Sequence, residues 1–231
     1  MKKRILTFIV IGIVAMSCNS NWDMPLKVRF IQLCPDSTIF NVALETSTTP
    51  GILYSGLQYP NSSKFIQKTL SLGDQEPITF HLEKNGSKNA LLVWGHSVSF
   101  TGTIIISGTI DSLQSCIINP SDRTYLGDTT SFNFVNAVVN SGLYDLKLGN
   151  QMLFQNRPYF STDRQLDSCY VLTQTKTTDT LFVYKSGTSQ IVANLPFAPY
   201  ASNRNCTITI SGLEGSTDFK KLRVSLFPNN K

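Results

Sequence analysis

Two parts of this chain repeat the same residue pattern 104 positions apart. Val28-Arg29-Phe30-Ile31 aligns with Phe132-Asn133-Phe134-Val135, and residues 103–108 align with residues 207–212 at the same offset of 104. Five of the six residues in the second alignment are identical. A repeat with a fixed period is the signature of a duplicated structural unit. The sequence therefore predicts two homologous domains of about 100 residues each.

Each copy of the repeat contains short segments in which apolar and polar residues alternate. Residues 132–138, 143–148, 207–210 and 222–226 all follow this period of two. Successive side chains of a strand point to opposite faces, so one face can be buried while the other stays in water. The sequence therefore predicts an all-β fold of two tandem small antiparallel β-sandwich domains, immunoglobulin-like or transthyretin-like in outline.

The N-terminal segment has the order of a secretory signal. Lys2-Lys3-Arg4 precedes the apolar run 5–16, and Ser17 stands directly before Cys18. This order resembles the bacterial lipoprotein signal, in which cleavage leaves the cysteine as the first mature residue and the cysteine carries the lipid. The resemblance implies an outer-membrane lipoprotein of the cell envelope that meets the membrane through Cys18. A transmembrane anchor and ordinary secretion are the alternatives, and a helix of twelve residues would span only about 18 Å of a roughly 30 Å core.

The signal and the repeat together predict the domain organisation. We expect a signal peptide over 1–17, a tether over 18–26, a first sandwich over 27–118, a linker over 119–130 and a second sandwich over 131–228. A fully extended tether would reach roughly 30 Å and would hold both sandwiches clear of the bilayer.

Cysteine usage and charge fit an extracytoplasmic protein. After Cys18 the remaining cysteines are even in number, and they are candidate disulfide partners: Cys34, Cys116, Cys169 and Cys206. The sequence leaves their pairing open, and four separate buried thiols are the alternative. Loss of residues 1–17 lowers the formal net charge from +5 to about +2, without any run of Lys or Arg. Such a small balance argues against nucleic acid as a partner.

The start of the first copy resembles a known family. Residues 28–37, which read VRFIQLCPDS, are followed by Phe40-Asn41-Val42 and by residues 53–59. This order is similar to the opening of the domain-of-unknown-function 4397 family, in which a VRF-like strand runs into a turn and a second strand. The second copy departs from that pattern, since Asn133 replaces the arginine. The resemblance implies a secreted or lipid-anchored bacterial β-domain, and it implies no activity.

Patterns that would indicate catalysis or metal binding are weak. Residues 91–99 resemble a nucleophile elbow around Ser97, but a strand-like segment follows the serine and no histidine lies downstream. The only two histidines, His81 and His96, are poorly spaced for zinc, and the acidic residues form no calcium loop. We therefore expect no catalytic residues, no metal and no cofactor, and we predict that the protein is not an enzyme.

Aromatic residues in predicted loops are the candidate binding residues. They are Tyr54, Tyr59, Tyr159, Phe160 and Tyr200. Loop aromatics can stack on sugar rings or anchor a protein partner, although they can also plug the ends of a sandwich. The sequence thus predicts a non-catalytic, lipid-anchored envelope protein for adhesion or ligand binding, whose partner is an unknown protein or glycan. A structural fimbrillin-like subunit of a Bacteroidetes-type envelope and an accessory glycan-binding lipoprotein are the alternatives.

Overall fold

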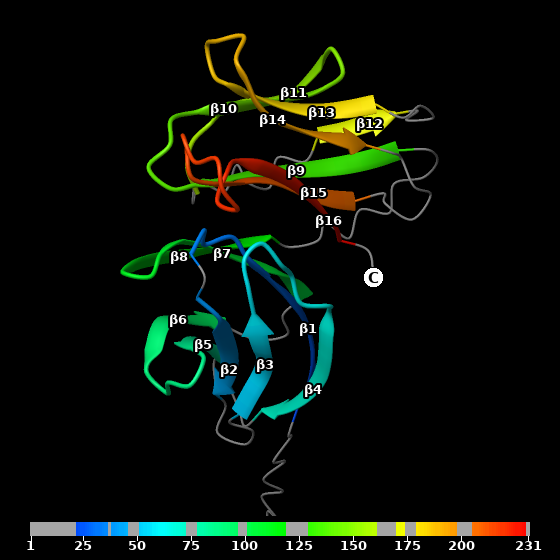
Figure 1. The fold of residues 1–231 in the computed structure, drawn as a ribbon. Coiled ribbons are helices and arrows are strands. Elements are labelled where there is room, and N and C mark those ends of the chain that lie inside the picture. Colours follow the sequence, from blue (N-terminus) through cyan, green and yellow to red (C-terminus); the bar gives the residue numbers. More distant parts are fainter. Residues whose placement is uncertain are drawn as a thin grey trace, which may run out of the picture.

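Four sheets of four strands each make up the part of the chain that the computed structural model describes (Figure 1). The described residues are 22–36, 38–45, 51–72, 78–96, 101–118, 129–160, 170–173, 179–197 and 205–229. Among them, no helix has the length and apolar character needed to cross a membrane. Cys18, the predicted lipidation site, lies outside the described residues.

The first eight strands form two of the sheets. Their bounds are β1 Trp22–Gln32, β2 Phe40–Glu45, β3 Gly51–Leu57, β4 Ile66–Leu72, β5 Ile78–Lys84, β6 Ala90–His96, β7 Thr101–Thr109 and β8 Ser112–Ile118. One sheet has the order β4-β1-β7-β8 and the other has the order β3-β2-β5-β6. The two sheets pack face to face as a sandwich.

The last eight strands repeat this topology strand for strand. Their bounds are β9 Thr129–Val138, β10 Tyr144–Leu148, β11 Gln151–Arg157, β12 Tyr170–Thr173, β13 Asp179–Lys185, β14 Ile191–Phe197, β15 Asn205–Gly212 and β16 Arg223–Pro228. Their sheets have the orders β12-β9-β15-β16 and β11-β10-β13-β14. The predicted all-β fold of two tandem sandwiches is confirmed. One pair in each sandwich, β1 with β7 and β9 with β15, is parallel rather than antiparallel.

Period-two alternation builds the core of each sandwich. In β1, Val28 and Phe30 point inward, and in the facing sheet Phe80 of β5 does the same; all three are fully buried. The rings of Phe30 and Phe80 meet edge to face with their centroids 5.9 Å apart. The second sandwich is closed in the same way, by Phe132 and Phe197 at 5.4 Å. Burial of such side chains is the main favourable term that holds each pair of sheets together.

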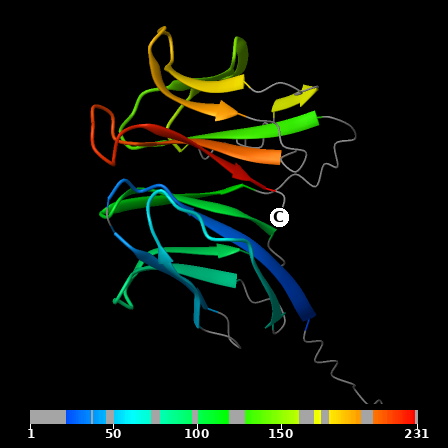
Figure 2. The ribbon, with the colours of Figure 1, turned by 45° about the vertical axis from the view of Figure 1, so that its right-hand side comes forward.

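A third apolar core joins the two sandwiches, and we call it the seam. It lies between sheet β4-β1-β7-β8 and sheet β12-β9-β15-β16, so the four sheets stack as four layers (Figures 1 and 2). The seam contains Ile31, Leu33, Ile105, Cys116, Ile118, Val135, Ala137 and Phe160, with Tyr159 and Phe227 packed against them. The central strands β7 and β15 of the two inner sheets are therefore buried on both faces over most of their length, and Thr207 and Thr209 of β15 are fully shielded from solvent. The expectation that the polar face of this strand stays in water was wrong.

Arg29 crosses the edge of the seam. Its guanidinium donates hydrogen bonds to the hydroxyl of Thr103, to the side-chain oxygen of Asn229 and to the carbonyl oxygen of Pro228. Burial lowers the pKa of Arg29 to about 10, so the group is still charged at neutral pH. Because a buried charge is costly unless it is hydrogen-bonded, these contacts fix the C-terminal strand of the second sandwich against the first.

Two element boundaries differ from those expected. β1 begins at Trp22, within the segment 18–26 that was predicted to be a tether. β9 begins at Thr129, within the predicted linker 119–130, and residues 119–128 lie outside the described residues. Trp22 pairs with Leu72 of β4, so strand pairing begins only four residues after Cys18.

The seam predicts that the two sandwiches unfold together. Ile105→Ala removes a fully buried seam side chain and should lower the free energy of unfolding by about 2–4 kcal/mol, with one cooperative urea transition retained. Ile52→Ala, at a residue that is 60% exposed, is the matched control and should change stability little. Two separate transitions in the wild-type protein would contradict the prediction that the seam couples the two sandwiches. Equal losses of unfolding free energy in both variants would contradict it too.

Candidate functional site

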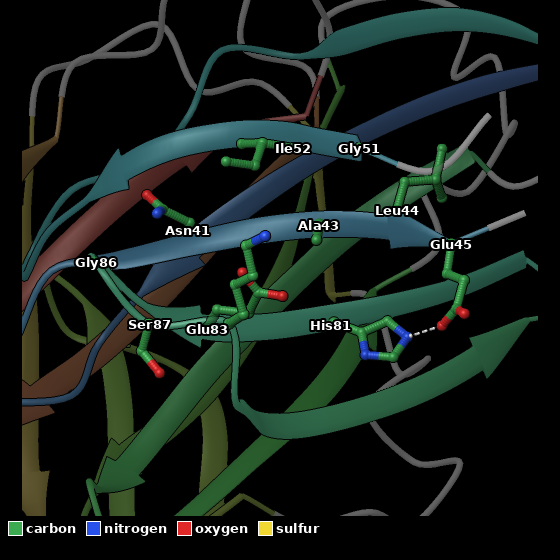
Figure 3. A pocket seen from close by; sticks show the side chains of 11 residues that line it. Asn41, Ala43, Leu44, Glu45, Gly51, Ile52, His81, Glu83, Gly86 and Ser87 are labelled. Atoms are coloured by element: carbon green, nitrogen blue, oxygen red, sulfur yellow. Dashed lines mark ion pairs between the residues drawn. The ribbon is translucent and has the colours of Figure 1, made fainter.

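The outer face of sheet β3-β2-β5-β6 carries an open hollow of about 710 Å³. Its walls come from β2, β3, β5 and the turn between β5 and β6 (Figure 3). The polar groups that line it are Asn41, Glu45, His81, Glu83, Ser87 and Lys88. Ala43 and Ile52 supply apolar surface. We refer to this feature as the hollow.

Strand alternation and register explain why these side chains meet. Phe80 and Leu82 of β5 are buried in the sandwich core, so His81 and Glu83 between and beyond them belong to the opposite face. His81 pairs across the sheet with Ala43 of β2, whose short side chain leaves the space of the hollow. Because β2 and β5 are far apart in the sequence, only their pairing brings the two rows together.

His81 and Glu45 form the closest polar contact in the hollow. The imidazole Nε2 lies 2.6 Å from Oε2 of Glu45, and the two groups are an ion pair when the imidazole is protonated (Figure 3). The His81 side chain is 22% exposed and that of Glu45 is 66% exposed. The Glu45 side chain therefore lies at the rim of the hollow in contact with water, while Nε2 of His81 is shielded, and an ion pair with one exposed partner contributes little stability.

Asn41, which lines the hollow, also holds β2 and β3 together by a hydrogen bond that we call the brace. Its side-chain oxygen accepts a hydrogen bond from the backbone N–H of Gly56, at a register shift between β2 and β3. The second sandwich repeats this bond, since Asp145 accepts from the backbone N–H of Asn156. Gly56 and Asn156 both have positive φ, 78° and 53°, so the brace holds an irregular backbone in each copy.

Two charged groups of the hollow are left for a ligand. Within the described part of the chain, neither the Glu83 carboxylate nor the Lys88 ammonium has a hydrogen bond or ion pair. No group of three or more His, Cys, Asp or Glu in that part could hold a metal ion. The hollow can therefore donate and accept hydrogen bonds and offer charge to a polar ligand.

The predicted binding aromatics do not gather at the hollow. Phe160 is 3% exposed in the seam, and Tyr159 stacks on it with ring centroids 5.5 Å apart. Tyr54 is half-buried against the first core, and the hydroxyl of Tyr59 is buried, with the Arg223 guanidinium 5.4 Å from its ring centre. Tyr200 lies outside the described residues. The packing of one sandwich on the other thus buries Phe160 and leaves Tyr159 half-buried, which fits the alternative that these aromatics fill the end of a sandwich.

The cysteines expected as disulfide partners occupy different cores. Cys34 and Cys116 are buried free thiols, in the first core and in the seam respectively. Cys206 is buried in the second core, and Cys169 lies outside the described residues. Burial raises the pKa of Cys116 to about 12 and also raises the pKa of Cys34. Cys34 and Cys116 therefore fit the alternative of separate thiols.

The hollow was not among the predicted sites. A local signal was present, because the run Phe80-His81-Leu82-Glu83 alternates and places a histidine and a carboxylate on one face. No local pattern indicates that Ala43 lies beside them, because β2 and β5 meet only through strand pairing.

Comparisons with known proteins show low similarity. No protein-family model and no curated protein matches the chain, so its resemblance to the domain-of-unknown-function 4397 family stays a prediction. A family 26 carbohydrate-binding module from Eubacterium rectale, solved with maltoheptaose, is 10% identical over 90% of this chain and 100% of its own, with a TM-score of 0.25. An alpha-glucan-binding streptococcal virulence factor is 11% identical over 88% and 96%, with a TM-score of 0.29. The fimbrial anchor protein Mfa2 from Porphyromonas gingivalis is 9% identical over 90% and 98%, with a TM-score of 0.28.

Buried thiols predict a loss of stability at alkaline pH. The pKa of Cys116 rises from 9.0 to about 12 on folding, so the folded protein keeps a proton that the unfolded chain loses. The contribution of the Cys116 thiol to the free energy of unfolding is fully present below pH 9. It is lost as the pH rises toward about 12, and the free energy of unfolding then falls by up to about 1.4 kcal/mol per pH unit. Urea unfolding at pH 8, 9 and 10 should show this decline, and Cys116→Ala should make it shallower, since the raised pKa values of Cys34 and Cys206 still contribute.

The matched control for this measurement is Ile118→Ala, which removes a non-titrating seam residue. It should lower stability at every pH and leave the slope unchanged. A Cys116→Ala protein with the wild-type slope would contradict the assignment.

Proposed function

We propose that the protein is a non-catalytic, lipid-anchored protein of the cell envelope that binds an extracellular glycan or protein ligand on an outer sheet face. The observation that carries the proposal is the hollow, an open space of about 710 Å³ with charged groups that no part of the described chain neutralises. Concave sites of this size with a few convergent polar groups are typical of ligand binding.

The geometry of the hollow favours binding over chemistry. Catalytic sites gain from the exclusion of water, which strengthens electrostatic interactions with the reacting atoms. Here the Glu45 side chain is 66% exposed, and its histidine partner lies on an open sheet face. Such groups can orient and hold a ligand while the Glu45 carboxylate remains open to water.

The stacking of the sandwiches supports a role in display. The seam occupies the inner face of each sandwich, so the two outer sheets face away from each other at opposite ends of the stack (Figures 1 and 2). β1 starts on the side of the first sandwich that is remote from the second (Figure 1). A lipid at Cys18 would thus place the second sandwich farthest from the membrane.

The anchor would hold the first sandwich close to the bilayer. Only residues 19–21 separate Cys18 from Trp22, the first residue of β1. Three residues and their flanking bonds reach on the order of 10–14 Å when extended, less than the roughly 30 Å expected of a tether through residue 26.

Charge in the hollow predicts its ligand. Two carboxylates and one ammonium line it, so a ligand with amino and hydroxyl groups should bind better than its neutral analogue. Calorimetry with a chitosan hexamer should detect binding, and Glu83→Gln should weaken it by about tenfold, the loss of one charge-assisted hydrogen bond. The N-acetylated hexamer should bind more weakly to the wild type.

Glu214→Gln is the matched control for that experiment. Glu214 pairs with Lys185 at 2.6 Å in the second sandwich, away from the hollow. Its substitution should leave binding of the chitosan hexamer unchanged. Equal affinity of the wild type and Glu83→Gln for the hexamer would show that the hollow is not the binding site.

The anchor has a separate test. In cells fed labelled palmitate, the wild-type protein should carry the label and sediment with membranes, because a thioether lipid requires the cysteine at position 18. Cys18→Ser should lose the label and leave the membrane fraction. Protease treatment of whole cells then reports which face carries the protein, and an unlabelled wild type would contradict lipid anchoring.

A further inference from the structure

Two aromatic side chains lie next to each other on the outer face of the second sandwich. Leu181 and Val183 of β13 are fully buried in the second core, so the alternate residues Phe182 and Tyr184 belong to the opposite, outer face. Their ring centroids are 6.4 Å apart with an interplanar angle of 53°. Both side chains are half-buried, and the sheet that carries them is the outermost layer of the stack (Figure 1).

The strand register surrounds these rings with a mixed set of groups. Lys147 and Asn194 flank Phe182 in one row across the sheet, and Asp145 and Ile191 flank Tyr184 in the next. Met152 lies beyond Lys147 at the edge strand. We call this surface the aromatic face; it comprises Lys147, Met152, Phe182, Tyr184, Ile191 and Asn194.

The aromatic face occupies the same positions as the hollow. In the first copy the row across the sheet is Ile52, Ala43, His81 and Val93. In the second copy the equivalent row is Met152, Lys147, Phe182 and Asn194. The small Ala43 that opens the hollow is thus replaced by lysine, and His81 is replaced by an aromatic ring. The same exposed surface therefore has a different chemistry in each sandwich.

One cation on this face has no ion-pair partner among the described residues. Asp145 lies in the next row of the same strand, opposite Tyr184, and its carboxylate is oriented by hydrogen bonds that it accepts from the backbone N–H of Asn156 at 2.8 Å and from the hydroxyl of Ser186 at 2.5 Å, rather than by an ion pair with Lys147. The Lys147 ammonium lies 4.6 Å from the centre of the Tyr184 ring, and no carboxylate within the described residues pairs with it. A cation held over an aromatic ring, at a partly exposed position, is available to an anionic ligand.

We propose that the aromatic face binds an acidic sugar unit of a glycan. The apolar face of the sugar ring would lie against Phe182 and Tyr184, and its carboxylate would accept a hydrogen bond from Lys147. Stacking and charge pairing are then both used, whereas a neutral sugar would leave the cation unpaired. A single-stranded nucleic acid also stacks on aromatic side chains, but it needs a row of cations along its backbone, and this face offers one.

This inference names a ligand class for the binding role proposed above and rests on that role. Its site is separate from the hollow, so the two can fail independently. Glu83→Gln, which tests the hollow, should leave binding at the aromatic face unchanged.

The test uses the purified mature protein and a matched pair of probes, hexagalacturonic acid and its fully methyl-esterified form. Wild type should bind the acid about tenfold more tightly than the ester, because esterification removes the charge that pairs with Lys147. Lys147→Met should abolish this preference while the ester still binds. Tyr184→Ala should weaken both probes, since the stacking surface is lost.

A second Lys–aromatic pair in the same chain provides the control variants. Lys220 lies 5.5 Å from the ring centre of Phe219, which is 55% exposed in the connection between β15 and β16. Phe219→Ala and Lys220→Met should leave both affinities unchanged. Urea unfolding confirms that each variant is folded, and the Lys147→Met comparison stands even if Tyr184→Ala destabilises the sheet.

Four results would overturn the proposal. One is an unchanged preference for the acid in Lys147→Met, and another is an equal loss of binding in the control pair. The third is tighter binding of an oligo(dT) probe than of hexagalacturonic acid, which would identify a nucleic-acid surface instead. The fourth is the absence of binding of either sugar probe by the wild type, which would reject the acidic-sugar ligand. Binding of the chitosan hexamer at the hollow is tested independently of this result.

Discussion

Burial of the second face of the two inner sheets is the interaction on which the rest of the structure depends. A lone sandwich exposes the outward rows of both its sheets to water. In this chain the outward rows of β1, β7, β9 and β15 pack on each other, so Ile31 and Ile105 are as buried as the residues of either core. Apolar contact provides most of the favourable free energy of the seam, and the hydrogen bonds of Arg29 fix its edge.

The seam also decides which surfaces can meet a ligand. It removes one face of each sandwich from solvent and leaves the sheets β3-β2-β5-β6 and β11-β10-β13-β14 at opposite ends of the stack. Those two sheets keep the same backbone brace, from Asn41 in one and Asp145 in the other, while the exposed rows differ. A duplicated scaffold with constant internal bonds and variable outer rows can therefore present two chemically different surfaces on one chain.

Local pattern predicted the strands well, because period-two alternation and the repeat offset depend only on neighbouring residues and on comparison of the chain with itself. It failed where long-range packing decides exposure. Tyr159 and Phe160 follow a strand and were expected to be loop aromatics, yet the first sandwich covers them. His81 was considered only as a metal ligand, since its neighbour Ala43 is 38 residues away and joins it only through strand pairing.

The sequence by itself determined the all-β class, the duplication and the positions of most strands, because side-chain alternation and turn residues act locally on the backbone. The lipoprotein signal that ends at Cys18 stays a prediction from a linear motif. Only the tertiary structure decided that the polar rows of β15 are buried, that Cys34 and Cys116 lie in separate cores, and that a hollow opens above Ala43. Those outcomes depend on which sheet faces meet, and apolar attraction between faces has no direction that a local pattern could encode.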